Sequence, residues 1–247
     1  MAFIKIEPIT IELEGALHIG AGYGRGLIDR AVVRDGRGQV YIPGSSLKGK
    51  VREACEQLAV AQGLENVCQP PYPRGMCGKS KELCIVCRIF GTPGGRHDES
   101  LGLHWDNAYL TEAWQQATER LPLSYPRTQV GMSRRRGVAR EGLLFTDEFA
   151  AENLTFQTGI SGHLPLTAVL DEPGRYYELI LLLAGLKMVD TLGGSTSRGA
   201  GRCRMRLPDE VTVRADDWPQ GKIEVAWLLD RLELLELYKE QVEETAR

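Results

Sequence analysis

The sequence lacks the features that mark several large classes of protein. Its 247 residues contain no run of about 18 apolar residues, so we expect neither a transmembrane helix nor a membrane partner. The N-terminus alternates apolar and polar residues and has no apolar signal-peptide core, which predicts a cytoplasmic location. Internal repeats and low-complexity tracts are absent as well. The composition, 43% hydrophobic and 26% charged, is that of an ordinary globular chain.

Net charge is also small, at −3, but the charges are separated along the chain. Residues 120–140 contain six arginines and no acidic residue, and residues 193–207 contain four arginines and no acidic residue. Residues 222–247 carry seven acidic and four basic side chains. A polyanion such as nucleic acid can therefore bind locally, although the chain as a whole is slightly acidic.

The pattern of apolar residues predicts an α+β fold. Residues 3–18 alternate as in a half-buried strand, and a hairpin with a type I′ turn is expected at Asp35-Gly36. A helix is expected to start within 43–46, with a serine as its N-cap, and to end near Ala61. The remaining core elements are strands at 101–110, 143–164 (two strands), 164–170 and 202–207, and a buried helix at 176–192.

This order of strands and helices lacks the strict alternation of a doubly wound sheet and predicts a ferredoxin-like (split βαβ) sheet with large insertions. Residues 63–100 form a Cys-, Pro- and Gly-rich insertion, and residues 111–142 form a polar excursion. Apolar residues between 225 and 242 have helical spacing and predict an acidic amphipathic terminal helix. We therefore predict one core over 1–207 and a C-terminal extension over 208–247.

Four cysteines in the insertion have the spacing of a structural zinc site. They follow the pattern C-x8-C-x6-C-x2-C and are Cys68, Cys77, Cys84 and Cys87. Four thiolates close a tetrahedral zinc site, with His97 and His104 as spare ligands. The alternative is four free thiols, but this loop has little core to order it without a metal. Cys55 and Cys203 lie in apolar patterns and are expected in the core.

Two Gly-rich segments could hold a sugar-phosphate backbone. The first, 44–50, matches the P-loop pattern G-x4-G-K, but Val51 stands where a P-loop needs a hydroxyl for Mg²⁺, which disfavours an NTPase. A helix N-terminus beside cations suits phosphate instead, and the alternative is a solvated basic face. The basic side chains on this helix are Lys48, Lys50 and Arg52.

The second Gly-rich segment, 192–201, contains Arg198 and precedes a strand in which arginines alternate with apolar residues. Its glycines allow the close approach of another backbone, which is typical of an RNA cradle. A third basic segment, 126–140, has few apolar anchors, and we expect it to become ordered on a partner. Its arginines are Arg127, Arg134, Arg135, Arg136 and Arg140.

Together, several of these segments resemble the RAMP superfamily of CRISPR proteins. They are Ile28–Asp35, Tyr41–Lys50, Cys84–Gly91 and Leu192–Gly201, in that order along residues 3 to about 207. The resemblance is closest to the repeated backbone subunit of type III effector complexes. It implies a modified RNA-recognition-motif core of the ferredoxin-like type and a β-hairpin thumb at about 125–150. It also implies a cysteine insertion in some relatives only.

The resemblance further implies an endoribonuclease that works within a ribonucleoprotein complex. Copies of the subunit, together with other RAMP subunits, would bind a CRISPR guide RNA and cleave complementary single-stranded target RNA with Mg²⁺ or Mn²⁺. The implied catalytic residue is Asp29, as a general base or a metal ligand; the alternative is a turn aspartate that caps its own backbone. The implied guide-binding residues are Ser45, Lys48, Lys50, Arg52 and Arg198.

Other functions stay open at this point. The second hypothesis is the same filament role without cleavage, with another subunit cutting the target. A guide-processing RAMP nuclease usually has a His-centred site, and the four histidines here lie outside the Gly-rich loops. A zinc-dependent interaction module would leave those loops unexplained. His18 is expected in the core, and Tyr23, Phe90 and Trp105 are expected either to stack on bases or to lie in the core.

Overall fold

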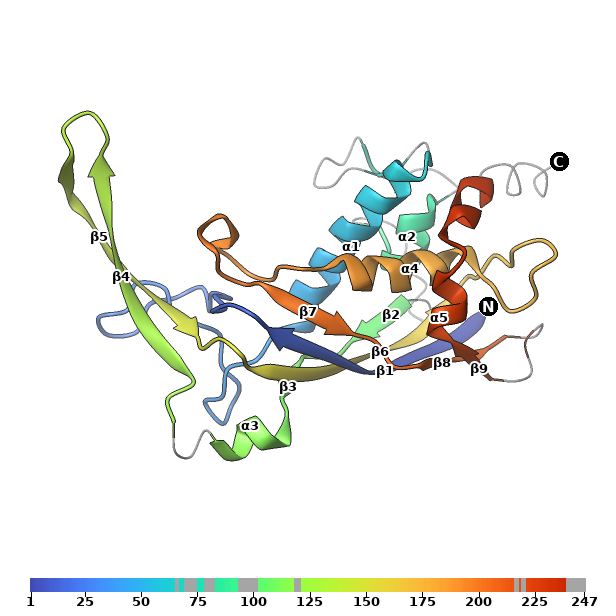
Figure 1. The fold of residues 1–247 in the computed structure, drawn as a ribbon, viewed down its shortest axis with the longest axis horizontal. Helices are drawn as coiled ribbons and strands as arrows, with labels where there is room; N and C mark the ends of the chain where they lie inside the picture. The colour runs from blue at the N-terminus through green and yellow to red at the C-terminus, as the bar shows by residue number, and fades with distance from the viewer. Residues whose placement is uncertain are drawn as a thin grey trace.

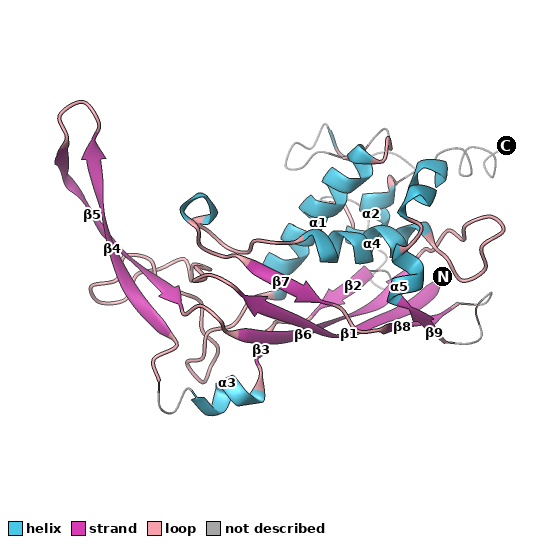
Figure 2. Ribbon diagram, in the orientation of Figure 1, coloured by secondary structure: helices cyan, strands magenta, loops and turns pink. Residues whose placement is uncertain are grey.

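The protein has a sheet layer and a helix layer, with a long hairpin projecting from one end (Figure 1). The structure, a computed structural model, describes residues 1–64, 67–68, 75–77, 83–92, 102–117, 121–215, 218 and 221–238. Figure 2 shows most of the helices on one side of the sheet, and the hairpin beyond the ends of the central strands. No helix in these ranges is long and apolar enough to cross a membrane.

The elements follow one another through both layers. The sheet consists of β1 (Ala2–Leu13), β2 (Gly102–Trp105), β3 (Tyr109–Leu110), β6 (Thr155–Leu164), β7 (Cys203–Arg206), β8 (Glu210–Arg214) and β9 (Lys222–Glu224). The hairpin consists of β4 (Ser124–Ser133) and β5 (Val138–Ala150). The helices are α1 (Gly44–Ala61), α2 (Ile85–Phe90), α3 (Glu112–Ala117), α4 (Tyr177–Met188) and α5 (Val225–Leu229), with 3-10 turns at Thr196–Arg198 and Leu232–Leu237.

Strand β1 is the centre of the sheet. The order is β2-β6-β1-β8-β9, with β3 on β6 and β7 on β1, and every pair is antiparallel. Ile6 lies opposite Ile160 and Ile11 opposite Phe156, and the register shifts between Ile6 and Ile9. Because side chains alternate along a strand, β1 presents its isoleucines to the helices and polar residues to the open face.

The helix layer packs tightly over these isoleucines. Helix α1 buries Leu47, Val51 and Cys55, which recur at helical spacing. Helix α4 is buried on nearly all sides because α1, α2 and the C-terminal extension surround it. Gly185 permits the α1–α4 approach, since a Cβ there would lie 2.3 Å from the Cys55 Sγ. His18, Cys55 and Cys203 are all buried, as predicted.

Several predicted elements differ in detail from the structure. No serine caps α1: Pro43 is the N-cap residue, and the Asn107 Oδ1 accepts the Gly44 N–H at 2.9 Å. The turn after Asp35 is not type I′, because Gly38 rather than Gly36 has positive φ. The segment 164–170 is not a strand. The Thr167 N–H donates to a carboxylate on α4 rather than to a neighbouring strand.

The C-terminal extension also differs from the prediction. It adds β8 and β9 to the sheet before any helix, since Val211 and Val213 point into the core. The predicted terminal helix is divided into α5 and a 3-10 turn, and the rest of it lies beyond the described residues.

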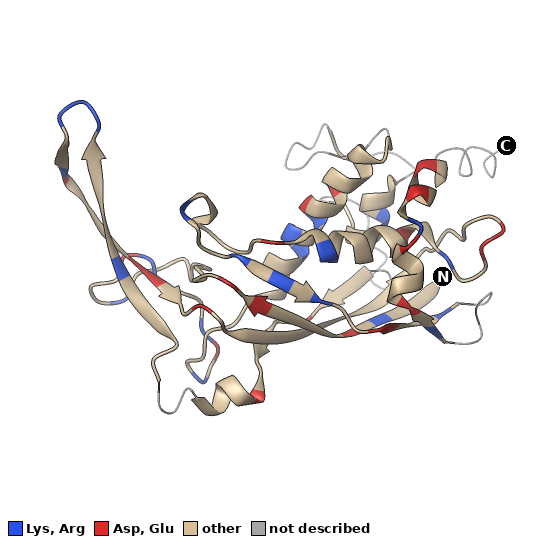
Figure 3. Ribbon diagram, in the orientation of Figure 1, with Lys and Arg blue, Asp and Glu red and all other residues tan. Residues whose placement is uncertain are grey.

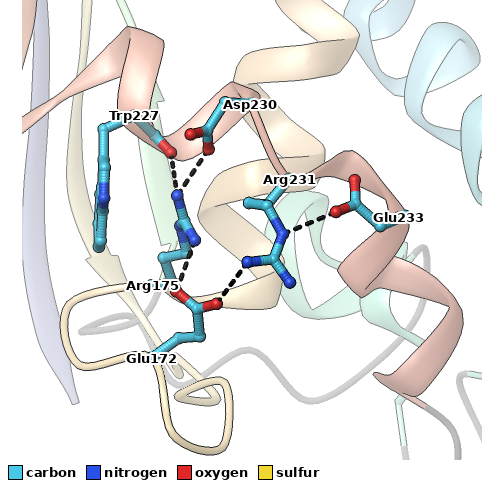
Figure 4. A network of polar contacts seen from close by, with 6 residues as sticks. All are labelled: Glu172, Arg175, Trp227, Asp230, Arg231 and Glu233. Carbon is cyan, nitrogen blue, oxygen red and sulfur yellow. Dashed lines mark hydrogen bonds and ion pairs between the residues drawn. The ribbon is translucent and has the colours of Figure 1, made fainter.

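A polar cluster attaches the extension to the body (Figure 4). The Arg175 guanidinium is 4.1 Å from the Trp227 ring centroid and donates to the Trp227 carbonyl at 2.7 Å. It also pairs with Glu172 at 2.5 Å and with Asp230 at 2.6 Å. Arg231, which is more exposed, bridges Glu172 and Glu233 at 2.8 and 2.6 Å.

We expect Arg175→Ala to lower the free energy of unfolding by about 3 kcal/mol, the lower end of the cost of breaking a buried ion pair. We expect the lower end of this cost because the Asp230 carboxylate is exposed to water, so it stays hydrated when its partner is removed. Urea unfolding of the full chain measures this loss. The matched control Arg231→Ala should change stability little, since exposed ion pairs contribute little. Equal losses in both variants would contradict a special role for Arg175.

Candidate functional site

Asp29 is held against the hairpin by its own carboxylate. Residues 19–33 fold back on themselves, with the Val33 N–H donating to the Ile19 carbonyl at 2.9 Å. Beyond the turn, the Asp29 N–H donates to the Thr146 carbonyl at 2.9 Å, and the Thr146 N–H donates to the Asp29 Oδ2 at 2.6 Å. Asp29 is exposed, and its Oδ1 has no partner among the described residues. The carboxylate therefore binds the backbone along β5 rather than capping its own turn, and one oxygen stays available.

The next residue, Arg30, pairs with a carboxylate of β5. Its Nε and Nη2 donate to the two oxygens of Asp147 at 2.6 and 2.5 Å. Asp147 is completely buried, whereas half of the Arg30 side chain is exposed. Successive residues of the loop are thus fixed to successive residues of β5.

The same carboxylate connects to the Gly-rich loop through β4. Gln129 donates to the Asp147 Oδ2 at 2.8 Å, and Arg198 donates to the Gln129 Oε1. Arg198 also reaches the Ser195 hydroxyl at 3.2 Å. Arg127 lies opposite Asp147 in the hairpin register. Arg127 and Arg198, predicted separately as RNA-binding residues, therefore line one hollow of about 280 Å³.

A second carboxylate, Glu148, anchors the base of the hairpin. It accepts from the Val32 N–H at 3.1 Å, from Arg34 at 2.5 Å and from the Ser124 hydroxyl at 2.7 Å. Burial alone would raise the pKa of Glu148, but these donors lower it below its ordinary value. The His18 Nδ1 lies 2.6 Å from the Glu148 carbonyl, so His18 supports this base as part of the core.

The glycines of the loop 192–201 serve its own packing. A Cβ on Gly193 would lie 2.4 Å from the His18 carbonyl oxygen, and one on Gly201 would lie 1.9 Å from the Leu192 carbonyl oxygen. Both residues also have positive φ. At these two positions the backbone that approaches closely is the protein's own, and the approach of an RNA backbone to this loop stays a prediction.

The basic residues of α1 differ in how free they are. Ser45 is exposed, and Lys48 has no acidic partner within the described chain. Burial and the neighbouring Arg52 lower the pKa of Lys48. Lys50 pairs with Glu53 at 2.9 Å. Arg52 donates to Glu56, to the Gly91 carbonyl and to the Cys87 Sγ, which disfavours it as a phosphate ligand.

Positive charge is concentrated in three places. Figure 3 shows Lys and Arg on α1, along β7 and on the loop that precedes it, and at the tip of the hairpin. Burial raises the pKa of the Cys203 thiol, at the start of β7, to about 12. The positive charge of Lys50 opposes this rise, so Lys50 lies near Cys203. The α1 and β7 groups are therefore neighbours.

The hairpin tip lies apart from Asp29. Arg134, Arg135 and Arg136 occupy the turn between β4 and β5, about 20 Å beyond Arg127 at the usual rise of a strand. The hairpin also exposes large apolar side chains, which are Tyr125, Val130, Met132, Val138, Leu143 and Leu144. A two-stranded ribbon with exposed apolar groups is marginal alone and suited to a partner.

The four insertion cysteines meet at one point. The Sγ atoms of Cys68, Cys77, Cys84 and Cys87 all lie within 4.8 Å of one another, so this cluster could hold a metal ion. Backbone N–H groups donate to the Cys68, Cys77 and Cys84 sulfurs at 3.0, 3.3 and 3.5 Å. Interaction with Cys87 lowers the pKa of the Cys84 thiol below its ordinary value. His104 pairs with Asp106 instead, and His97 lies outside the described residues.

Sequence reasoning missed Arg30, Gln129 and Asp147. A signal existed, because Asp147 and Glu148 interrupt an apolar strand, and buried acids need partners. Of the predicted stacking residues, Tyr23 is exposed, whereas Phe90 is buried and stacks on Trp105. Those two rings belong to the core.

Comparison with known proteins shows which proteins this chain is similar to. The chain is 28% identical to the "CRISPR system Cms endoribonuclease Csm3" of Methanocaldococcus jannaschii, over 79% of this chain and 76% of that protein. It is 29% identical to the proteins of the same name from Enterococcus italicus and Streptococcus thermophilus, each over 86% of this chain and 92% of the relative.

Its fold is similar to that of a chain in the cryo-EM structure of the type III-B Cmr-beta bound to cognate target RNA. The TM-score is 0.56 at 12% identity, covering 84% of this chain and 97% of that one. The family model of the RAMP superfamily matches residues 10–204. The chain therefore belongs to the RAMP superfamily.

Proposed function

We propose that this protein is a backbone subunit of a type III CRISPR ribonucleoprotein. It binds guide RNA and cleaves complementary target RNA, with Asp29 as the catalytic residue. The main observation that supports this proposal is the exposed Asp29 carboxylate, which β5 holds beside a hollow lined by Arg127 and Arg198. The names of the Csm3 relatives, which describe endoribonucleases, support the cleavage activity.

We also infer that residues 1–207 form a modified RNA-recognition-motif core of the ferredoxin-like type. The core elements follow one another in the order β1, α1, β2, β6, α4 and β7, and the four strands belong to one antiparallel sheet. This order supports the ferredoxin-like topology. Residues 208–247 form an added extension. The cysteine cluster holds a structural zinc ion, because four thiols and several N–H donors match the ligand set that zinc prefers.

Cleavage uses the nucleophile that RNA carries, its 2′-OH. The protein must align this hydroxyl in line with the phosphorus and accept its proton, and orientation alone supplies several kcal/mol. The Asp29 Oδ2 is occupied by the Thr146 N–H, so the free Oδ1 is the atom that accepts the proton or binds a cation.

A divalent ion, Mg²⁺ or Mn²⁺, would neutralise charge on the phosphate in this reaction. Within the described ranges, the only group of three or more potential metal ligands is the cysteine cluster. Such an ion would therefore be held by the Asp29 Oδ1 together with RNA phosphates. Mg²⁺ is commonly held by one or two carboxylates and substrate oxygens, so the residues fit.

RNA binding rests on the basic and apolar groups described above. Arg127 and Arg198 contact the backbone near Asp29, Ser45, Lys48 and Lys50 extend the path along α1, and the arginines of the hairpin tip, Arg134, Arg135 and Arg136, lie further out. The exposed apolar groups of β4 and β5 suit insertion between bases, which splays a nucleotide for in-line attack. Sequence specificity then comes from the guide.

The direct test is to purify the full chain from its host under native conditions and sequence the RNA it retains. We expect short RNAs that share a repeat-derived end and differ in their remaining sequence. Further RAMP subunits should co-purify with them. Recovery of the protein free of RNA, or with unrelated RNA only, would contradict guide binding.

We further expect the double substitution Arg127→Ala with Arg198→Ala to weaken binding of single-stranded RNA. Loss of two phosphate contacts should reduce the slope of log K against log salt by about 1.4, at roughly 0.7 per contact. Fluorescence anisotropy over a KCl series measures this slope. Arg231→Ala, on the C-terminal extension, should leave it unchanged. An unchanged slope in the double variant would remove these arginines from the interface.

A further inference from the structure

Arg30 combines an exposed guanidinium with a fully buried counter-ion. Half of its side chain is exposed, and Asp147 is not exposed at all. The pair is bidentate, and Gln129 supplies a third hydrogen bond to the carboxylate at 2.8 Å. A buried carboxylate with three donors is a rigid support, so the guanidinium it holds has a fixed direction.

The rest of the guanidinium is unoccupied. A guanidinium has five N–H groups, and the pair with Asp147 uses one on Nε and one on Nη2. No acceptor for the other three lies within the described part of the chain. The Phe145 ring centroid lies 5.4 Å from the Arg30 Cζ and steadies the group. The free donors therefore face solvent on the residue that directly follows Asp29.

We propose that Arg30 binds the scissile phosphate of the target RNA and stabilises the charge that builds on it, and that Asp147 positions Arg30. The inference rests on the proposed cleavage at Asp29. Asp29 and Arg30 are adjacent, and β5 holds them through the adjacent residues Thr146 and Asp147. The proton acceptor and the cation thus share one support.

The reaction explains why a cation is needed at this place. The 2′-oxygen forms a bond to phosphorus and gives its proton to Asp29, or to solvent where Asp29 holds the divalent ion, while the bond from phosphorus to the 5′-oxygen breaks. The leaving oxygen takes a proton from solvent, so atoms and charge balance without any redox step. In between, the non-bridging oxygens carry extra negative charge. A planar fork of N–H donors fits two such oxygens.

The test uses the assembled complex, with target RNA at saturation and a single turnover. We expect Arg30→Ala to slow cleavage by about 100-fold, as for loss of one charge-stabilising donor, with target affinity changed by less than threefold. Arg30→Lys should recover part of the rate, since it keeps the charge without the fork. Added guanidinium ion at millimolar concentration should partly restore Arg30→Ala. Asp147→Asn should slow cleavage by about tenfold.

Arg25→Ala is the matched control, since Arg25 lies in the same loop and forms only backbone hydrogen bonds there. It should cleave at the wild-type rate. A wild-type complex that does not cleave would overturn the proposed function itself. If the wild type cleaves, full activity of Arg30→Ala, or a loss of affinity alone, overturns the inference. Failure of both lysine and guanidinium to restore any rate also overturns it, because a purely structural role gives that result.

Discussion

Asp29→Ala should abolish target-RNA cleavage by the assembled complex, with a loss of at least about 1,000-fold, the upper part of the range for a general base. The free Oδ1 has no substitute, because within the described ranges no other carboxylate is held in this way beside the Arg127–Arg198 hollow. Binding should persist, since the arginines are untouched. Single-turnover assays with labelled target, beside affinity measurements, separate the two effects.

Two further variants sharpen this experiment. Asp29→Asn keeps the hydrogen bond from the Thr146 N–H but loses the charge, so it should be as inactive as alanine. Asp35→Ala removes an acid from the turn that follows, where the carboxylate only accepts from the Arg37 and Gln39 N–H groups. That variant should cleave normally. Cleavage by Asp29→Ala at every site it covers would assign cutting to another subunit and leave this one a guide-binding filament subunit.

Removing the metal from the cysteine cluster should have the largest effect on stability. Metal analysis of the purified protein should give about one zinc ion per chain. Zinc supplies an apparent ~10–16 kcal/mol in isolated zinc modules. Here α2 also packs on α1 and α4, so we expect a loss of about 3–5 kcal/mol and a Tm about 10 °C lower or more. Calorimetry before and after chelation measures the change.

The substitution Cys84→Ser should reproduce the effect of chelation and reduce the zinc content. Its matched control is Cys203→Ala, a buried cysteine outside the cluster, which should keep a full complement of zinc. Freshly purified protein without zinc, or equal zinc content in both variants, would show that the four thiols are not a metal site.

The features that the sequence predicted well are those encoded locally. The cysteine spacing alone indicated a cluster whose sulfurs lie within 4.8 Å. Helices α1 and α4 followed from apolar spacing and from an apolar run. The strands at 102–105 and 203–206 also follow from local alternation. In the helices and strands, the residues that face the core recur within a few positions of one another, and the four cysteines lie within one 20-residue segment.

The features that escaped prediction depend on contacts between distant segments. Arg30 and Asp147 are 117 residues apart, and nothing near either of them specifies the other. The cap of α1 comes from Asn107, 63 residues away from Gly44, so a serine beside the helix was the wrong choice. The catalytic interpretation of Asp29 came from resemblance, because one aspartate after a Gly-rich loop has many structural uses.

The central place of β1 has a consequence for how the chain is made. Its partners β6, β7 and β8 begin at residues 155, 203 and 210, so the first strand synthesised is among the last to be paired. At about 5–20 residues per second, its isoleucines wait roughly ten seconds or more for a neighbour. During that interval the segment exposes its isoleucines on one face and unpaired backbone N–H and C=O groups along both sides. The sheet can therefore be completed only after most of the C-terminal half has emerged from the ribosome.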